Sequence, residues 1–473
     1  MKRQSLLLGL VASTMAPGCS TELPPTGQVL LYIDTDAPLP PGPGAEPRPD
    51  EPHALFDTLR VDVIEPGDTS PCAGCSRTFA LTTPQVQAGE ASIGIPSEPG
   101  RTGYRARLRM YHSGATLTGS LPESLAADWP PQSVVDVTVA LPEVAEEGIV
   151  DATAFLPTDA VGIPRGSLEA PESTQSGRPN PSQVGSWPGA QVVPCAGAPL
   201  EGEVCIPGGA YWMGNPLTRG TGRGDEADLR RLVVLSPFYM DATEVTVARQ
   251  RAAMGSQSAQ PWSGSTAGDS ATDYCPFTEQ PGPNEDEPVA CVSLDRARQH
   301  CEARGGNLPT MAQFEYVASG LESRLFVWGR DLATCDDAVI WRVGFGMLQV
   351  STACPTPGPP GGPEIVGNLV APPRRDRLEL PTGTVYDLVG NVSEYTLDLW
   401  NRQDEPCWSG GGVYHDPLCV NESPTDGYQI TYRGGAWIGQ TRFATAAGLH
   451  SYKPTGASFP IFVGFRCVRP ATE

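Results

Sequence analysis

The chain has 473 residues, an apolar fraction of 39% and a formal net charge of −22 at pH 7. This acidity excludes a nucleic-acid-binding role, because contacts to phosphate groups need a basic surface. Glycine (53) and proline (50) are both frequent but follow no collagen-like period. The composition therefore predicts two or three loop-rich globular domains joined by linkers.

Residues 1–19 predict export. A short basic start, MKRQ, precedes an apolar run, SLLLGLVASTM, that is too short to span a membrane. The run leads to APGC, which resembles a bacterial lipobox ending at Cys19. We therefore expect residues 1–19 to be a lipoprotein signal peptide, and Cys19 to be lipidated and to anchor the mature chain in the outer membrane or at the cell surface. The alternative is a plain secretory signal, which also exports the chain.

The cysteine count predicts disulfide bonds. The chain has 13 cysteines, and setting Cys19 aside leaves an even number in a protein expected to be exported. Short loops favour five pairs, which leaves two cysteines to pair across a long loop. The CAGC sequence could instead be a redox pair, but it lacks the strand-to-helix setting that activates one. The expected bridges are Cys72–Cys75, Cys195–Cys205, Cys275–Cys291, Cys335–Cys354, Cys407–Cys419 and Cys301–Cys467.

Residues 20–158 are expected to form a small all-β sandwich. Apolar residues alternate with polar ones in TLRVDVI, YRARLRMY and VVDVTVAL, and clusters of Gly, Pro and Ser separate these runs. Period-two patterns of this kind predict antiparallel strands with one buried face. Arg105, Arg107 and Arg109 share the other face of one strand, where we expect them to be solvated.

A change in composition marks the domain boundary. Residues 159–194 are rich in Pro, Gly and Ser and poor in apolar side chains, which predicts a flexible linker. Residues 195–473 then form a second domain in which two helices can be placed. The first begins after Ser293 as N-cap, and the second after Thr310, which forms a capping box with Gln313.

Seven blocks in the second domain resemble the sulfatase-modifying-factor family, which includes the formylglycine-generating enzyme. This resemblance implies an α+β fold of the C-type-lectin-like type with low secondary-structure content. It also supports a Cys301–Cys467 bridge between the first helix and the last strand. The blocks are IPGGAYWMGN, LSPFYMDATEVTVAR, CVSLDRARQHCEARGGNLPTMAQFEYVASG, FVWG, YDLVGNVSEYTLDLW, YRGGAWI and VGFRCVR.

The resemblance also identifies what this chain lacks. The formylglycine-generating enzyme holds Cu(I) between two cysteines five residues apart, because a cuprous ion prefers thiolate ligands. Aligning RGGAWIG on that motif places Gly439 and Ala444 at the two positions, and neither side chain can bind metal. Copper-dependent oxidation is therefore not expected.

A histidine-bound iron is a second family chemistry to consider. A related branch, the ergothioneine-type sulfoxide synthases, uses three histidines, whereas the histidines of this chain show no ligand spacing. Only His450, near the Gly-Gly turn, merits a direct test. The five histidines are His53, His112, His300, His415 and His450.

A structural calcium ion is the metal that the family resemblance favours. In DLVGNVSE, Asp387 and Glu394 supply carboxylates, and Gly390 and Val392 could supply backbone carbonyls. Calcium binds such mixtures of oxygen ligands in loops. The alternative is a Gly-Asn turn in which Asp387 caps local amides.

Two functions remain open from the sequence. The first is a non-catalytic binding or structural module, held at the membrane by its lipid anchor, whose partner would be a peptide, a glycan or an envelope protein. Aromatic residues near the Gly-Gly turn could line its contact surface: Trp437, Phe443, Tyr452 and Phe459. The second is an oxidoreductase of the formylglycine-generating or non-haem iron type that acts on protein or small thiol substrates.

Overall fold

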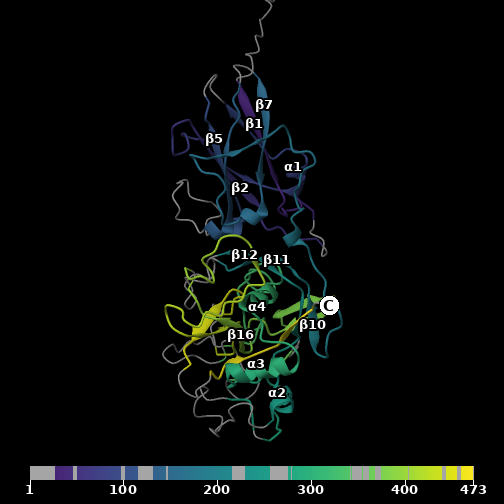
Figure 1. Ribbon diagram of the computed structural model, residues 1–473. Coiled ribbons are helices and arrows are strands. Elements are labelled where there is room, and N and C mark those ends of the chain that lie inside the picture. The colour runs from purple at the N-terminus through teal and green to yellow at the C-terminus, as the bar shows by residue number, and fades with distance from the viewer. Residues whose placement is uncertain are drawn as a thin grey trace, which may run out of the picture.

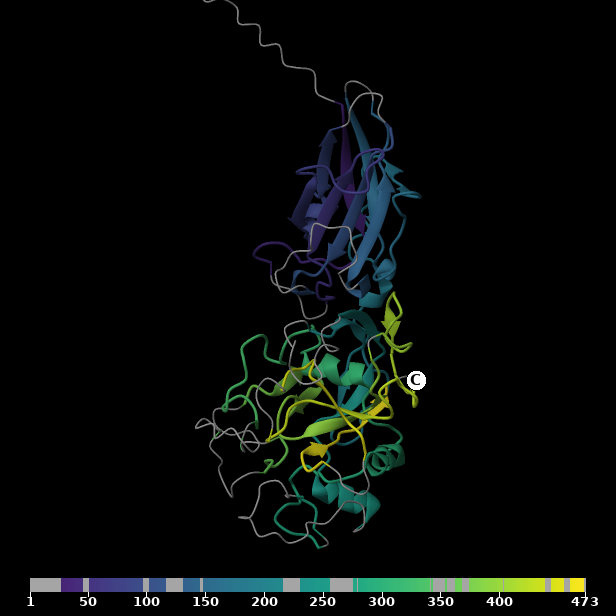
Figure 2. The ribbon, with the colours of Figure 1, turned by 90° about the vertical axis from the view of Figure 1, so that its left-hand side faces the viewer.

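The computed structural model shows two bodies stacked end to end, as two perpendicular views agree (Figures 1 and 2). Within the described ranges, no helix combines the length and the apolar content that crossing a membrane requires. The structure describes residues 27–45, 51–96, 102–115, 131–144, 148–215, 230–255, 275–278, 280–340, 342, 354, 362–367, 374–402, 404–438, 444–454 and 460–471.

The N-terminal body is a sandwich of two sheets, with one short helix, α1 (Thr83–Gln87). The first sheet has the order β4-β1-β7-β9, and its strands are β4 (Ser92–Pro96), β1 (Gln28–Thr35), β7 (Ile149–Leu156) and β9 (Gln175–Ser176). The second has the order β3-β2-β5-β6-β8, and its strands are β3 (Ser76–Ala80), β2 (Thr58–Ile64), β5 (Arg105–Tyr111), β6 (Val134–Ala140) and β8 (Glu172–Ser173).

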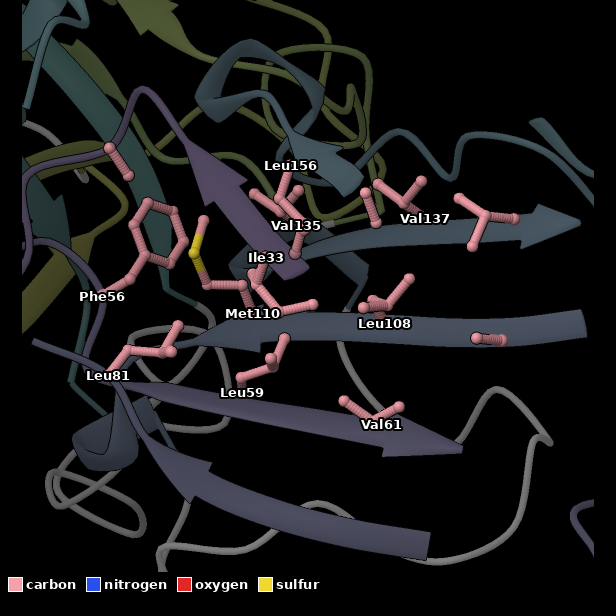
Figure 3. Packing of buried hydrophobic residues seen from close by; sticks show 14 of the residues in the cluster. Ile33, Phe56, Leu59, Val61, Leu81, Leu108, Met110, Val135, Val137 and Leu156 are labelled. Carbon is pink, nitrogen blue, oxygen red and sulfur yellow. The ribbon is translucent and has the colours of Figure 1, made fainter. Parts of the chain in front are cut away.

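The alternating apolar residues face a common core between the sheets, as the sequence predicts. They extend from three neighbouring strands of the second sheet toward Ile33 and Leu156 of the first (Figure 3). All are at most 2% exposed, and they include Leu59 and Val61 of β2, Leu108 and Met110 of β5, and Val135 and Val137 of β6.

The strand neighbours differ in part from the expected antiparallel arrangement. The first strand, β1, pairs in parallel with β7, and β6 pairs in parallel with β8. The remaining pairs in the sandwich are antiparallel. Alternation along a strand reports which face is buried, but it carries no information about which distant strand lies alongside.

Of the three arginines on this face of β5, Arg109 is not solvated as expected, whereas Arg105 and Arg107 are partly exposed. Arg109 is 5% exposed and donates from Nη2 to Oδ2 of Asp62 at 2.6 Å. Arg60 donates from Nε to both oxygens of the same carboxylate, at 3.0 and 3.1 Å. Asp62 has no exposed surface, and these hydrogen bonds hold the pKa of its carboxyl below the usual range against the opposing effect of burial. Cross-strand charge pairing thus replaces hydration on this face.

The Pro- and Gly-rich segment 159–194 is ordered, so the expectation of a flexible linker is wrong. It contains β8 and β9, each of which extends one sheet of the sandwich. Trp187 is 2% exposed in the sandwich core, and its Nε1 donates to Oδ1 of Asp159 at 2.8 Å. A few buried anchors therefore order a segment whose average composition is polar.

Within its described residues, the C-terminal body contains four small sheets and three helices, which agrees with the expected α+β fold of low secondary-structure content. Its helices are α2 (Val247–Met254), α3 (Leu294–Ala303) and α4 (Met311–Ala318). Its strands are β10 (Glu203–Ile206), β11 (Gly209–Met213), β12 (Arg231–Leu235), β13 (Phe238–Asp241), β14 (Arg377–Leu380), β15 (Gly383–Tyr386), β16 (Ser393–Leu399), β17 (Tyr414–His415), β18 (Ile430–Arg433), β19 (Leu449–Tyr452), β20 (Val463–Gly464) and β21 (Val468–Pro470).

Both predicted helices are confirmed with their caps. The Ser293 side chain accepts from the backbone N–H of Arg296 at the start of α3. At the start of α4, Thr310 and Gln313 form the complete capping box. Helix α2 was not predicted, although its N-cap Thr246 lies inside the LSPFYMDATEVTVAR block. This helix has almost no apolar periodicity, because Val247 and Gln250 are its buried residues.

All six predicted disulfides are present. The bridge Cys301–Cys467 joins α3 to the segment just before β21, across 166 residues of chain. The other five close loops of 3 to 19 residues. Pairing the nearest cysteines across short loops therefore predicted the bridges of this chain correctly.

The β11–β12 hairpin connects the two bodies because both of its faces are buried. Tyr211 and Val233 point into the C-terminal core, while Trp212 and Leu232 belong to the core of the sandwich. Figure 1 places this hairpin at the top of the C-terminal body, directly beneath the sandwich. Continuous apolar strands are typical of sheets covered on both sides. We call this contact the interdomain seam.

Candidate functional site

The Gly-Gly turn after β18 is held by close backbone packing. Gly434 has φ of +74°, in the left-handed region that favours glycine. A Cβ atom on Gly435 would lie 2.6 Å from Cβ of Ala444 and would overlap the carbonyl oxygen of Val389. The turn is fixed further by a hydrogen bond from Trp437 N to Asn391 O at 2.9 Å. These two glycines are therefore explained by packing alone.

No thiol faces this turn in the part of the chain that the structure describes. Ala444, aligned with the second copper-binding cysteine of the family, has no exposed surface, and its methyl group packs against Gly435. Gly439, aligned with the first, lies outside the described residues. All twelve cysteines that follow Cys19 are bound in disulfides, so none offers a free thiolate to a metal. Cys19 itself lies outside the described residues.

The histidines do not converge. His53 and His112 lie in the sandwich, and His415 lies on the two-residue strand β17. His300 is buried on α3, where its Nδ1 lies 2.7 Å from Oε1 of Gln250. His450 on β19 stacks on Tyr432, with ring centroids 5.3 Å apart. Among the described residues, no group of three or more His, Cys, Asp or Glu side chains could hold a metal ion.

The predicted calcium ligands lie in a tight, buried turn. Asp387 and Asn391 have φ of 56° and 63°, a backbone region that residues other than glycine rarely adopt. Gly390 packs so closely that a Cβ atom there would lie 2.9 Å from Val339 N. Val392 is 1% exposed. Strained backbone of this kind is typical of binding loops whose surroundings fix their shape.

Carboxylates are in excess around this turn. Glu394 has no exposed surface and accepts from Arg466 through both oxygens, at 2.6 and 2.7 Å. Asp387 is 9% exposed and accepts from Gly367 N at 2.7 Å. Glu244, from the segment after β13, is fully buried and lies near both carboxylates. Burial, followed by the charges of Asp387 and Glu394, raises the pKa of the Glu244 carboxyl well above the usual value.

This donor set fits a hard cation. Burial raises the pKa of Asp387 and Glu394 as well, although the charge of Arg466 acts to lower both. Each carboxylate oxygen has two lone pairs, so an oxygen that already accepts one hydrogen bond can still bind a metal. Asp387 in the turn and Glu394 on β16 carry oxygen ligands of the type that calcium prefers.

Glu244 and Arg466 were missed as site residues. Both lie inside blocks that carry the family resemblance, Glu244 in DATEV and Arg466 in GFRC. Nothing in their local spacing relates them to Asp387, because they are 143 and 79 residues away in the chain (387 − 244 and 466 − 387). Only the fold brings these three segments together.

Asp376 provides a buried carboxyl next to the same turn. Its Oδ1 accepts from the backbone N–H groups of Leu388 and Val389, both at 3.0 Å. Burial, followed by the charge of Asp387, raises the pKa of Asp376 from 3.8 to about 8. Because the folded pKa lies above the unfolded value, its contribution to stability is fully present below about pH 4 and is lost as the pH rises through about 8.

The substitution Asp376→Asn is therefore expected to remove a pH dependence of stability. Between about pH 6.5 and about pH 8, the free energy of unfolding of the unsubstituted protein should fall about 1.4 kcal/mol per pH unit more steeply than that of the variant. Urea unfolding in the presence of a chelator measures both slopes. Parallel slopes would show that Asp376 is ionised throughout this range.

Half-buried aromatic side chains gather on β18 and the edge strand β19. Tyr432 contacts His450, Tyr452 and Phe462, with ring centroids 5.3 to 6.2 Å apart. Tyr452 also shares a hydrogen bond of 3.0 Å with the hydroxyl of Tyr395. Of the aromatic residues named from the sequence, Tyr452 therefore lies in this cluster. Trp437 is instead fully buried, and Phe443 and Phe459 lie outside the described residues.

Comparison with known proteins identifies the family of the C-terminal body. Residues 190–471 match the model of the sulfatase-modifying factor enzyme 1-like domain. The chain is 30% identical to the formylglycine-generating enzyme of Mus musculus over 189 residues, which are 38% of this chain and 43% of that protein. It is 27% identical to the Bos taurus enzyme over 341 residues, which cover 63% and 78% of the two chains. The chain is 25% identical to the Streptomyces coelicolor enzyme, and the match covers 57% of this chain and 90% of that protein.

Solved structures with a related arrangement include PvdO from Pseudomonas aeruginosa and Treponema denticola variable protein 1. The first is 20% identical with a TM-score of 0.39, and the second is 16% identical with a TM-score of 0.38. Each match covers 57% of this chain and 94% of the other. The family match itself extends over more than half of the sequence. Through residues 190–471, the chain belongs to the family of sulfatase-modifying factor enzyme 1-like proteins.

Proposed function

We propose that this protein is an exported lipoprotein whose formylglycine-generating-enzyme-like domain recognises a partner rather than oxidising a substrate. One observation carries the proposal. All twelve cysteines after Cys19 are bound in disulfides, and a buried methyl group, that of Ala444, stands where the family's second copper ligand aligns. A cuprous ion needs soft ligands, and no free thiolate is available among the described residues to supply them.

The half-buried aromatic cluster on β18 and β19 supports a binding role. Tyr432, His450 and Tyr452 offer ring faces and polar tips on an edge strand, and rigid amphipathic rings of this kind are enriched in contact surfaces. A peptide, a glycan or an envelope protein are the partners that such a surface would suit. Attachment to the membrane through Cys19 would place the module at the outer membrane or the cell surface.

The competing function is oxidation of a cysteine in a protein or a small thiol, and a direct assay separates the two. The purified protein is incubated with a peptide that carries a sulfatase motif, under oxygen, with copper or with iron, and the peptide mass is followed. We expect no change of mass, whereas the Streptomyces coelicolor enzyme provides the positive control. Conversion of the peptide cysteine to an aldehyde by this protein would overturn the proposal.

Calcium is proposed as a structural ion at the turn around Asn391. Asp387 and Glu394 would hold it, with the carbonyls of Gly390 and Val392 completing the ligand set, and the ion would neutralise buried negative charge there. Within the described residues this requires no rearrangement of the disulfide framework. Calcium would have no part in electron transfer, which agrees with a binding module.

Adding calcium to chelator-treated protein is therefore expected to raise the melting temperature, because a ligand that binds only the folded state stabilises it. The variant Asp387→Asn should lose most of this increase. Differential scanning calorimetry measures both, and Asp295→Asn, on the first turn of α3, is the matched control. An equal rise in the D387N variant and in the unsubstituted protein would place the ion elsewhere.

A further inference from the structure

The apolar part of the interdomain seam centres on one side chain. The indole ring of Trp212 meets the ring of Phe56 edge to face, with centroids 5.4 Å apart, and its Nε1 donates to the carbonyl oxygen of Leu55 at 2.6 Å. A second contact links Gly412 N to the carbonyl oxygen of Val161 at 2.7 Å. These contacts join the sandwich to the C-terminal body.

The polar part of the seam contains a buried arginine that lacks an ion pair with any described carboxylate. Arg230, which immediately precedes β12, is 5% exposed. Its Nη1 lies 3.5 Å from Nδ1 of His112, on the sandwich, and its Nε is buried without a hydrogen-bond partner among the described residues. A buried guanidinium in such surroundings is poorly compensated, and burial lowers the pKa of Arg230 to about 10.

The hydrogen bonds around His112 require that its ring be neutral. The backbone N–H of Gly114 donates to Nδ1 of His112 at 2.9 Å, and Arg230 presents a second donor to the same atom. A guanidinium cannot accept a hydrogen bond, so Nδ1 must carry a lone pair and the ring proton must be on Nε2. Protonation of Nδ1 would turn the acceptor into a third donor and place a second cation beside Arg230.

His53 is a second histidine of the sandwich that lies near charged residues of the C-terminal body. Its Nε2 is buried without a hydrogen-bond partner among the described residues, and it lies near Glu322 and Arg324 of the C-terminal body. These two residues are already paired with each other at 2.6 Å, so the carboxylate of Glu322 is shared. A proton on His53 would therefore gain little net attraction.

The charged groups that face His112 favour the neutral ring overall. Asp57 is the attractive partner, with Oδ2 at 4.0 Å from Nε2, but its carboxylate already accepts from Ser113 N and Oγ, both at 2.6 Å. Arg230, Arg330 and His53 are the repulsive groups. Burial, followed by Arg230, lowers the pKa of His112 to about 4, and burial lowers that of His53 to about 4.

We propose that acid opens the interdomain seam. The seam is closed while the His112 ring is neutral and accepts a hydrogen bond from Arg230. Protonation of His112 and His53, which face arginines of the C-terminal body, opens it. Opening would separate the sandwich from β11–β12 and expose the apolar faces of Trp212 and Phe56. Histidine is suited to such a device because small changes of environment set the pH at which its charge changes.

The test compares the full chain with a variant that keeps the acceptor but cannot titrate. In His112→Asn, the side-chain oxygen can replace Nδ1 as acceptor for Gly114 and Arg230. Small-angle scattering follows the separation of the two bodies, amide hydrogen exchange follows the β11 segment, and near-ultraviolet circular dichroism reports whether both cores stay folded. His415→Asn, on β17, is the control, because its side chain is exposed.

We expect the unsubstituted protein and the H415N variant to elongate, and their β11 amides to lose protection, around pH 4 while both cores stay folded. H112N should open at a pH lower by about one unit, and H112N with His53→Gln lower still. If opening occurs at the same pH in the H112N and H415N variants, these histidines do not control the opening of the interdomain seam. If both cores unfold before the bodies separate, the seam is not the acid-labile element. Either result would overturn the proposal.

Discussion

Replacing Arg466 by alanine is expected to lower the free energy of unfolding by about 3–5 kcal/mol, because it leaves a buried carboxylate without its cation. Arg466 is fully buried and holds both oxygens of Glu394, at 2.6 and 2.7 Å. The same guanidinium donates to the carbonyl oxygens of Tyr386 and Asp387, at 2.9 and 3.0 Å. It therefore ties β15, the turn from Asp387 to Asn391 and β16 to the segment that precedes β21.

Chemical denaturation in the presence of a chelator measures this loss. Arg298→Ala provides a matched control, because Arg298 pairs with Glu302 at 3.6 Å on the exposed side of α3 and should contribute at most about 1 kcal/mol. Adding Glu394→Gln to the R466A variant should recover part of the stability, since it removes the uncompensated charge. A loss in R466A no larger than in R298A, or no recovery in the double variant, would mean that the ion pair does not hold this region.

Removal of the Cys301–Cys467 bridge is the second large effect that we expect. The two cysteines are 166 residues apart, and the chain-entropy model gives a contribution of about 5 kcal/mol for a loop of this length. The bridge also lies in a core, with Cys301 at 0% and Cys467 at 6% exposure. The double variant Cys301→Ala/Cys467→Ala should accordingly be much less stable than the unsubstituted protein.

The bridge Cys72–Cys75 supplies the comparison. It spans only three positions, so the same model gives about 2 kcal/mol for Cys72→Ala/Cys75→Ala. Urea unfolding of both double variants, with the remaining bridges kept oxidised, measures the two losses. Similar losses would show that strain or structure in the unfolded chain, rather than loop length, determines what these bridges contribute.

Local signals predicted much of the fold. The period-two runs marked the buried faces of β2, β5 and β6, and the caps at Ser293 and Thr310 marked the starts of α3 and α4. Each signal depends on residues within about one turn or one strand of each other, so it can be recognised from the sequence alone. The short-loop disulfides are local in the same sense.

Two of the errors involve distant contacts. The arginine face of β5 was expected to be solvated, but Asp62, on a neighbouring strand, pairs with Arg109. Segment 159–194 was expected to be flexible, but its buried Trp187 anchors it to a core formed by other strands. In both cases the residues are polar, as predicted, but the local sequence pattern does not indicate which distant residues order them.

The candidate site divides in the same way. The sequence by itself determined that Ala444 cannot bind copper, that Asp387 and Glu394 could hold calcium, and that twelve cysteines were available to pair, because these are properties of residue type and spacing. Only the tertiary structure brought Glu244 and Arg466 to the turn from Asp387 to Asn391, and only it placed Arg230 against His112. Burial and charge compensation depend on which distant segments meet, and a linear pattern does not encode this locally.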